Sequence, residues 1–201
     1  YSHRNTFLSA TSNLMVWSMP QNPIYLWTLP MFHCNGWTFP WAIAAMGGTN
    51  VCLRKIDAPS IYGAIAEHRV THFCGAPIIL GLVINAKESD RRAFDHMVNI
   101  FTAAAPPPPA VLERVEQMGF RVTHVYGLTE CSGPATICAW HEDWNDLPPG
   151  EQVTLKARQG VRYPMLEDLM VADPKTLEPV AQDGETMGEV FMRGNMIMKG
   201  Y

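Results

Sequence analysis

The stretch Tyr126–Glu130, within HVYGLTECSG, gathers residue types that could hold a nucleotide. Tyr126 offers a flat aromatic face for a purine, and Gly127 would let backbone approach a ligand closely. The Thr129 hydroxyl can donate to a phosphate, and the Glu130 carboxylate can hold a divalent cation. A glycine and a threonine are also common where a strand runs into a turn, so these residues alone leave both interpretations open.

A second candidate for chemistry lies in MFHCNGW, residues 31–37, where His33 precedes Cys34. A cysteine beside a histidine can form an activated nucleophile. However, adjacent residues usually point apart, and catalytic pairs meet in space rather than in sequence, so the pattern does not favour this chemistry. His33 by itself is either a loop histidine bonded to backbone or a group that acts on a substrate.

The elements that must position these residues alternate between strands and helices. Apolar, β-branched and aromatic runs predict strands at 24–30, 50–54, 71–75, 98–104 and 121–127. Helical spacing and proline positions predict helices at 3–19, 38–46, 60–69, 77–87 and 109–119. This alternation is typical of βαβ units, so we expect an α/β fold with a mostly parallel sheet and helices on both faces.

Ligands of such sheets bind beyond the carboxyl ends of the strands. Three stretches should lie at that edge: MFHCNGW at 31–37, AAAPPPP at 103–109 and YGLTE at 126–130. The sequence therefore predicts that segments far apart along the chain converge on one site.

The character of the sequence changes after about residue 135. Helical periodicity ends there, and short apolar runs are separated by Pro, Gly and Asp-Gly turns. We therefore expect an α/β part at residues 1–140, followed by a small β-rich subdomain at residues 141–201.

Composition excludes several classes of protein. With 201 residues and 47% hydrophobic content, the chain can fill a real core. The net charge of -4, with 15 Lys and Arg spread thinly, offers no basic stripe for nucleic acid. No apolar run reaches about 18 residues and no leader pattern is present, so we expect no membrane partner and a cytoplasmic location. Five separated cysteines without a C-x-x-C pair favour reduced thiols.

Four motifs in one order give the chain a resemblance to a known superfamily. LPMFHCNGW at 29–37, AAAPPPP at 103–109, YGLTE at 126–130 and GEVFMRGNMIMKGY at 188–201 resemble successive core motifs of the adenylate-forming enzymes. That superfamily contains acyl-CoA synthetases, luciferases and the adenylation domains of peptide synthetases. The residues after His33 look most like the acyl-activating branch that uses short or medium acids.

The resemblance implies a role for each matching residue. Tyr126 and Gly127 would contact adenine and its surroundings, with the Tyr126 ring stacked on the base. Thr129 would contact the phosphate of ATP and then of the acyl-adenylate. Glu130 would help to hold Mg²⁺, and His33 resembles the gate beside the carboxylate and the incoming thiol of CoA.

Two further segments are assigned by the same resemblance. The family's Gly-Gly-Ala-Pro segment, which runs along the adenine and the acyl pocket, corresponds here to Ala103, Ala104, Ala105 and Pro106. The acyl pocket would be lined by Trp37 and by the turn of Gly75, Ala76 and Pro77, with packing in the core as the alternative.

The activity implied is that of an ATP-dependent, AMP-forming acid–thiol ligase: an aliphatic or aromatic carboxylic acid reacts with ATP, and CoA then accepts the acyl group. The family's phosphate loop would precede Tyr1, and its C-terminal domain with the catalytic lysine would follow Tyr201. We therefore expect a central part of a ligase that is inactive alone. The alternatives are an adenylating domain with another acyl acceptor and a non-catalytic nucleotide- or acyl-binding module. A homodimer is a further expectation, on symmetry grounds.

Overall fold

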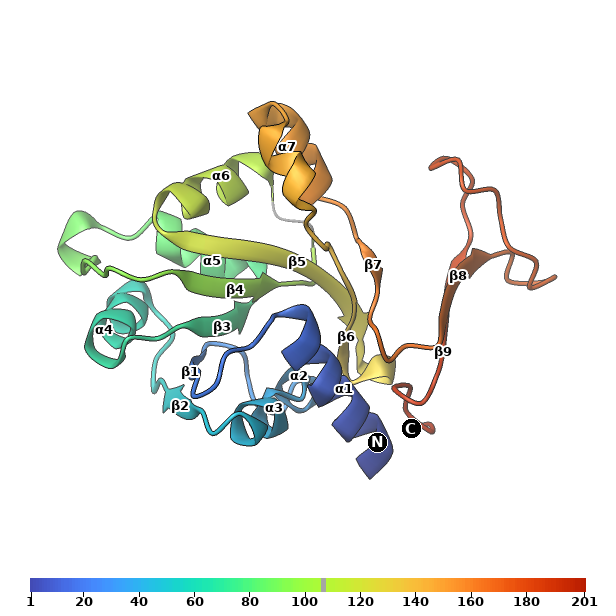
Figure 1. Ribbon diagram of the computed structural model, residues 1–201, viewed down its shortest axis with the longest axis horizontal. Coiled ribbons are helices and arrows are strands. Elements are labelled where there is room, and N and C mark those ends of the chain that lie inside the picture. Colours follow the sequence, from blue (N-terminus) through green and yellow to red (C-terminus); the bar gives the residue numbers. More distant parts are fainter. Residues whose placement is uncertain (106–107) are drawn as a thin grey trace.

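A seven-stranded sheet forms the centre of the computed structural model, which describes residues 1–105 and 108–201 (Figure 1). Along the sheet the strands follow the order β2-β1-β3-β4-β5-β6-β7. Their bounds are β1 Ile24–Trp27, β2 Thr49–Cys52, β3 His72–Gly75, β4 Val98–Thr102, β5 Phe120–Leu128, β6 Gly133–Ile137 and β7 Val161–Arg162. Strands β1 to β5 are mutually parallel, whereas β6 and β7 are antiparallel to their neighbours. The expected α/β fold with a mostly parallel sheet is confirmed.

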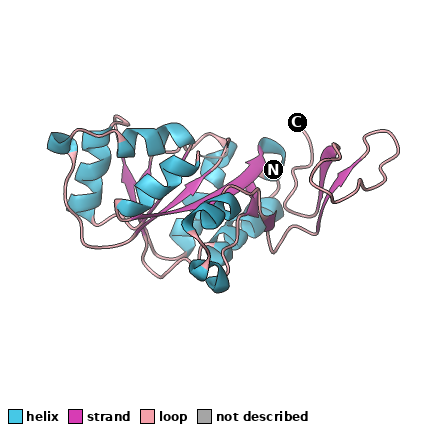
Figure 2. Cartoon of the chain, turned by 90° about the horizontal axis from the view of Figure 1, so that it is seen from above, coloured by secondary structure: helices cyan, strands magenta, loops and turns pink. Residues whose placement is uncertain are grey.

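Helices cover both faces of this sheet (Figures 1 and 2). On one face lie α1 (His3–Val16) and α3 (Phe39–Ala45), which share a core with the C-terminal segments. On the other face lie α4 (Ala58–His68), α5 (Pro77–Ile84) and α6 (Pro109–Gln117), which share a second core. The sheet is therefore the middle layer of three.

Successive strand residues alternate between the two cores. Tyr25 packs into the core beside α1, and its neighbour Leu26 packs into the core beside α4 and α5. Phe73 and Cys74 divide between the two cores in the same way. Side chains of a strand point to opposite faces in turn, so strands buried on both faces must be apolar throughout, which is the pattern the sequence showed.

Helix α1 begins and ends for local reasons. The Ser2 hydroxyl accepts a hydrogen bond from the Asn5 amide at 3.1 Å and so caps the first turn. The helix ends at Val16 and not near residue 19 as expected, because Ser18 takes a φ of 45° that a right-handed helix cannot continue.

The C-terminal part differs in one respect from its expected character. Strands β8 (Asp168–Ala172) and β9 (Glu189–Arg193) form a separate antiparallel pair that projects from the main sheet (Figure 2). This is the expected small β structure. However, β7 joins the main sheet, and helix α7 (Pro149–Lys156) occupies a stretch where no helix was predicted. The division of the chain near residue 140 stays a prediction.

A membrane span would need a longer and more apolar helix than any that residues 1–105 and 108–201 form.

Candidate functional site

A pocket of about 190 Å³ lies where the parallel strands end, at the carboxyl edge of the main sheet. Its lining comes from the loop after β1, the loop after β4, the end of β5, the turn that follows it and the start of β6: His33, Cys34, Trp37, Ala103, Ala104, Gly127, Leu128, Thr129, Gly133 and Pro134. The three stretches expected at this edge thus contribute to one pocket, because parallel strands deliver their following loops to the same side.

The loop after β1 enters the pocket as a left-handed turn, labelled α2 (Cys34–Trp37) in Figure 1. The φ angles of residues 34–38 lie between 44° and 63°. Hydrogen bonds from the Gly36 amide to the His33 carbonyl at 2.8 Å and from the Thr38 amide to the Asn35 carbonyl at 3.1 Å close the turn. Each non-glycine residue in this conformation costs about 1–2 kcal/mol, so the surroundings must hold the turn in place.

Cys34 lies between two side chains that the sequence assigned to the site. Its Sγ atom is 3.7 Å from Thr129 Oγ1 and 4.0 Å from Nε2 of the exposed His33. Burial raises the pKa of the Cys34 thiol, so the thiol stays protonated near neutral pH. Cys34 is therefore a neutral lining group rather than a nucleophile. It was not among the expected site residues, although its position after His33 was a signal.

Thr129 and Glu130 belong to η2 (Thr129–Cys131), a single 3₁₀ turn that follows β5. The Thr129 side chain is exposed on the lining of the pocket. The Tyr201 hydroxyl donates to Glu130 Oε1 at 2.8 Å and lowers the pKa of this carboxyl. The Met198 amide also donates to the Glu130 carbonyl at 2.8 Å. Glu130 is thus an ionised carboxylate at neutral pH, fixed by the C-terminal segment.

The donor chemistry of Glu130 fits a magnesium ligand. Mg²⁺ prefers oxygen ligands and usually binds one or two carboxylates together with waters and substrate phosphates. Within the described ranges, no group of three or more His, Cys, Asp or Glu residues could hold a metal. A magnesium ion at Glu130 would therefore depend on the phosphates of a bound nucleotide for most of its ligands.

Gly127 marks a close approach between two strands. A Cβ atom at this position would lie 1.9 Å from the Gly133 carbonyl oxygen and 2.8 Å from Pro134 Cα. The register of β5 against β6 shifts between Tyr126 and Gly127, as in a β-bulge. The glycine was expected to let backbone approach a ligand, and the structure shows that it lets β6 approach β5. Gly133 and Pro134 were missed because this contact is tertiary.

Several expected nucleotide-binding residues have different positions relative to the pocket. Ala103 is buried in the lining, and Ala104 lines it with a φ of 84°, a conformation that favours the glycine of the matching motif. Ala105 is exposed and does not line the pocket. Tyr126 is half-buried on β5 and also does not line it, and Pro106 lies outside the described residues.

The expected acyl-pocket residues also divide. Trp37 lines the pocket and is at the same time only 6% exposed in the core, so its packing in the core is observed and its contact with an acyl group stays a prediction. Gly75 ends β3, and Ala76 and Pro77 lead into α5. These three residues lie at the end of a strand that reaches the same edge, but the structure does not bring them into the pocket lining.

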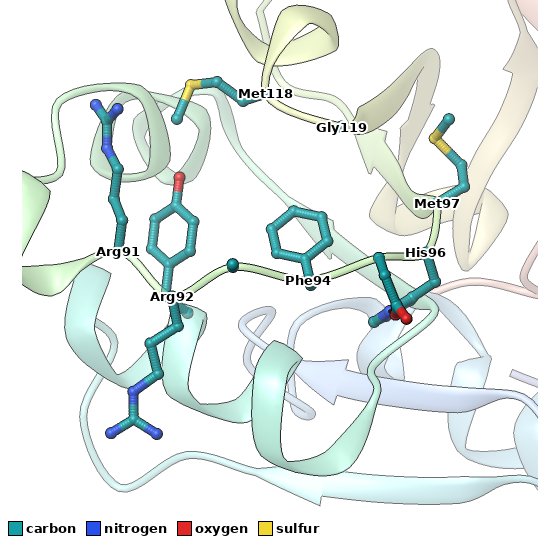
Figure 3. A pocket seen from close by; sticks show the side chains of 10 residues that line it. Arg91, Arg92, Phe94, His96, Met97, Met118 and Gly119 are labelled. Atoms are coloured by element: carbon teal, nitrogen blue, oxygen red, sulfur yellow. The ribbon is translucent and has the colours of Figure 1, made fainter.

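A second hollow, of about 540 Å³, lies at the opposite edge of the sheet (Figure 3). Met97 and Gly119, which directly precede β4 and β5, are part of its lining. Arg92 pairs with Glu67, and Arg91 donates to backbone carbonyls, so both guanidinium groups already have protein partners. The residues with the expected chemistry lie at the carboxyl edge and not in this hollow.

The whole chain, residues 1–201, matches the family model of the AMP-binding enzymes. The chain therefore belongs to this family, the adenylate-forming class that its motifs resemble. Its relatives include a peroxisomal acetate/butyrate–CoA ligase of Arabidopsis thaliana, 52% identical over 200 residues, and an acetate–CoA ligase of Humulus lupulus, 53% identical over 201 residues. These matches cover 99% and 100% of this chain but only 35% of each relative's length.

A solved structure gives the same answer for the fold. The O-succinylbenzoate coenzyme A synthetase of Bacillus subtilis, in complex with ATP and magnesium ion, superposes with a TM-score of 0.79 at 20% sequence identity. The likeness covers 100% of this chain and 38% of the synthetase chain. At this identity it concerns the fold alone.

The expected cytoplasmic location is wrong. The Arabidopsis acetate/butyrate–CoA ligase is peroxisomal by name, and so are a trans-cinnamate:CoA ligase of Petunia hybrida and a probable acyl-activating enzyme of Arabidopsis. A leader pattern concerns export through a membrane and does not separate the cytosol from the peroxisome. The sequence therefore held no observation that could make this distinction.

Proposed function

We propose that the polypeptide carrying this chain is an AMP-forming acyl-CoA ligase and that the carboxyl-edge pocket is part of its nucleotide and acyl site. The observation that carries the proposal is the meeting of three separated motifs in one pocket, with His33, Ala104 and Thr129 in its lining. Membership of the AMP-binding enzyme family supports it.

In this reaction the carboxylate oxygen of the acid attacks the α-phosphorus of ATP, and pyrophosphate leaves. The Thr129 hydroxyl donates to the phosphate on which negative charge accumulates, and Tyr126 stacks on adenine beyond the pocket lining. Glu130 would hold magnesium in part, and the ion would neutralise phosphate charge when it is bound. Positioning of the two reactants supplies much of the rate, so a rigid pocket edge is an advantage.

In the second half-reaction the thiol of CoA attacks the acyl carbonyl, and AMP leaves. The His33 side chain is exposed at the N-terminal end of the left-handed turn, where it is accessible to an incoming substrate. We assign to His33 the gate between the acyl-adenylate and the thiol. The raised pKa of the buried Cys34 thiol keeps this neighbour from competing with CoA as a thiolate.

The relatives suggest which acids to test. Their names specify acetate or butyrate, 2-methylpropanoate and trans-cinnamate as substrates. We expect the natural polypeptide to convert at least one of these acids, with ATP and CoA, to the acyl-CoA and AMP. Detection of both products by liquid chromatography and mass spectrometry checks the proposal.

The same assay distinguishes the rival functions. An adenylating domain with another acyl acceptor would show acid-dependent pyrophosphate exchange but form no thioester with free CoA. A binding module would bind ATP or AMP without any exchange. Either result would contradict the ligase proposal. Homodimer formation stays a prediction, which light scattering of the purified polypeptide can check.

A further inference from the structure

One buried asparagine from a distant helix holds the left-handed turn of residues 34–38. Asn13 lies on α1 and is only 1% exposed. Its Nδ2 atom donates to the Trp37 carbonyl at 2.7 Å and to Thr38 Oγ1 at 3.1 Å. Both acceptors belong to the C-terminal end of the turn, so a single amide group fixes the point where the unusual backbone ends.

The orientation of this amide is fixed from its other side. Asn13 Oδ1 accepts a hydrogen bond from the Tyr163 hydroxyl at 3.0 Å. A backbone carbonyl can only accept, so the Asn13 nitrogen must face Trp37 and the oxygen must face Tyr163. Tyr163 is itself fully buried, and its amide donates to the Ala135 carbonyl of β6 at 2.7 Å.

The turn connects Asn13 to the pocket, because residues at both ends of the turn contact the pocket lining. Cys34 at its start contacts both His33 and Thr129 through its sulfur atom. Trp37 at its end packs on the start of β6, where a Cβ atom at Gly133 would lie 3.0 Å from Trp37 Cα. Because non-glycine residues avoid this backbone conformation, the turn depends on contacts from outside itself.

We propose that Asn13 is a positioning residue, which holds the turn so that Cys34, His33 and Thr129 keep their arrangement in the pocket. The catalytic consequence rests on the proposed function, whereas the structural consequence does not. A residue that only filled the core would affect stability without changing the exposure of Cys34 or the turnover of a folded enzyme.

The test is an Asn13→Asp substitution in the natural polypeptide. A carboxylate cannot donate to the Trp37 carbonyl, so the turn should open and expose Cys34. Alkylation of Cys34 by iodoacetamide, followed by peptide mapping, should accelerate about tenfold, with the exposed Cys52 as internal standard. The kcat of adenylate formation should fall about tenfold to a hundredfold, while KM for ATP changes less than about threefold.

Two further variants keep the test decisive. Asn85→Asp removes a similar amide-to-carbonyl bond, to Gly81 at 2.9 Å on the exposed end of α5, and should change neither readout. Tyr163→Phe removes only the hydroxyl that orients Asn13. Like Asn13→Asp, it should accelerate Cys34 alkylation. In the double variant, Cys34 alkylation should be only a little faster than in Asn13→Asp, since both changes act through one amide.

The outcomes separate the two proposals. A folded Asn13→Asp variant with unchanged Cys34 alkylation, or with faster alkylation and unchanged kcat, overturns the positioning role. If Asn13→Asp does not fold, unchanged alkylation in Tyr163→Phe overturns it. Faster alkylation in a polypeptide that shows no adenylate formation even as wild type supports the anchoring of the turn and contradicts the proposed function.

Discussion

At the scale of single residues, Gly127 is a position of the site with almost no room for a side chain. A methyl group there would meet the Gly133 carbonyl oxygen at 1.9 Å, so β5 and β6 would have to separate. Gly127→Ala should lower the free energy of unfolding by about 2 kcal/mol or more, since overpacking in a rigid interior is costly. Urea unfolding of the wild type and the variant measures this difference.

A matched glycine gives the control. Gly81 lies inside α5, and nothing stands within 4 Å of an added Cβ atom. Gly81→Ala should leave stability unchanged or raise it by up to about 1 kcal/mol, because alanine favours a helix. Equal effects of the two substitutions would show that the approach of β6 to Gly127 is not rigid.

A buried histidine predicts a pH dependence of stability. Burial lowers the pKa of His72 from 6.5 to about 4. The unfolded chain therefore takes up this proton at higher pH than the folded chain, so stability is complete above pH 6.5 and is lost as the pH falls towards 4. The loss amounts to up to about 3 kcal/mol.

The measurement is the free energy of unfolding at several pH values between 7 and 4. His72→Phe should flatten this dependence. A residual slope is expected, because burial also lowers the pKa of His124. An unchanged slope in the variant would rule out His72 as its source.

Residue types alone revealed only part of the candidate site. His33, Thr129 and Ala103 were found because they follow strands that end together, and connectivity predicts that edge. Cys34 and Gly133 were missed because their place depends on a left-handed turn and on a strand reversal. Those features come from tertiary contacts, so the position of Cys34 directly after His33 was a signal that could not fix its place in the pocket, and no local pattern pointed to Gly133.

At the scale of elements, most strands and helices followed from periodicity, and two exceptions have physical causes. Helix α7 has no fully buried residue, so its apolar pattern is weak, although Pro149 at its first position and Lys156 in its last turn are helix signals. The turn of residues 34–38 is fixed by Asn13, which is 24 residues away from Trp37 in sequence. Local propensity could not predict it.

Helix α7 is attached to α6 by a partly buried ion pair. Lys156 Nζ lies 2.6 Å from Glu116 Oε2 and also 5.1 Å from the centre of the Trp140 ring. A double-mutant cycle with Glu116→Gln and Lys156→Met should give a coupling energy of about 1 kcal/mol, and amide exchange in residues 149–156 should accelerate in Lys156→Met.

The exposed pair of Arg69 and Asp95 is the matched comparison. Both side chains are more than half exposed, at 63% and 80%, so solvent screens their attraction. The corresponding cycle should show no measurable coupling. A zero coupling energy for Lys156 and Glu116 as well would mean that α7 is held by other contacts.

At the scale of the whole molecule, the candidate site depends on segments from both ends of the chain, which lie close together in Figure 1. Asn5 of α1 bonds the Met196 carbonyl, and the Met198 amide bonds the Glu130 carbonyl. The chain spans about a third of the length of the relatives described above, at 35%. Activity assays therefore need the natural polypeptide, whereas the residues described here form the edge of the pocket.

The measurement that tests the central claim most directly is acid-dependent exchange of pyrophosphate into ATP by the natural polypeptide, compared with its Thr129→Ala and Thr123→Ala variants. Thr123 lies on the same strand, β5, outside the pocket. The account predicts exchange in the wild type and in Thr123→Ala, and a loss of about a hundredfold in Thr129→Ala. Equal exchange in all three proteins, or no exchange with any of the acids proposed, would contradict it.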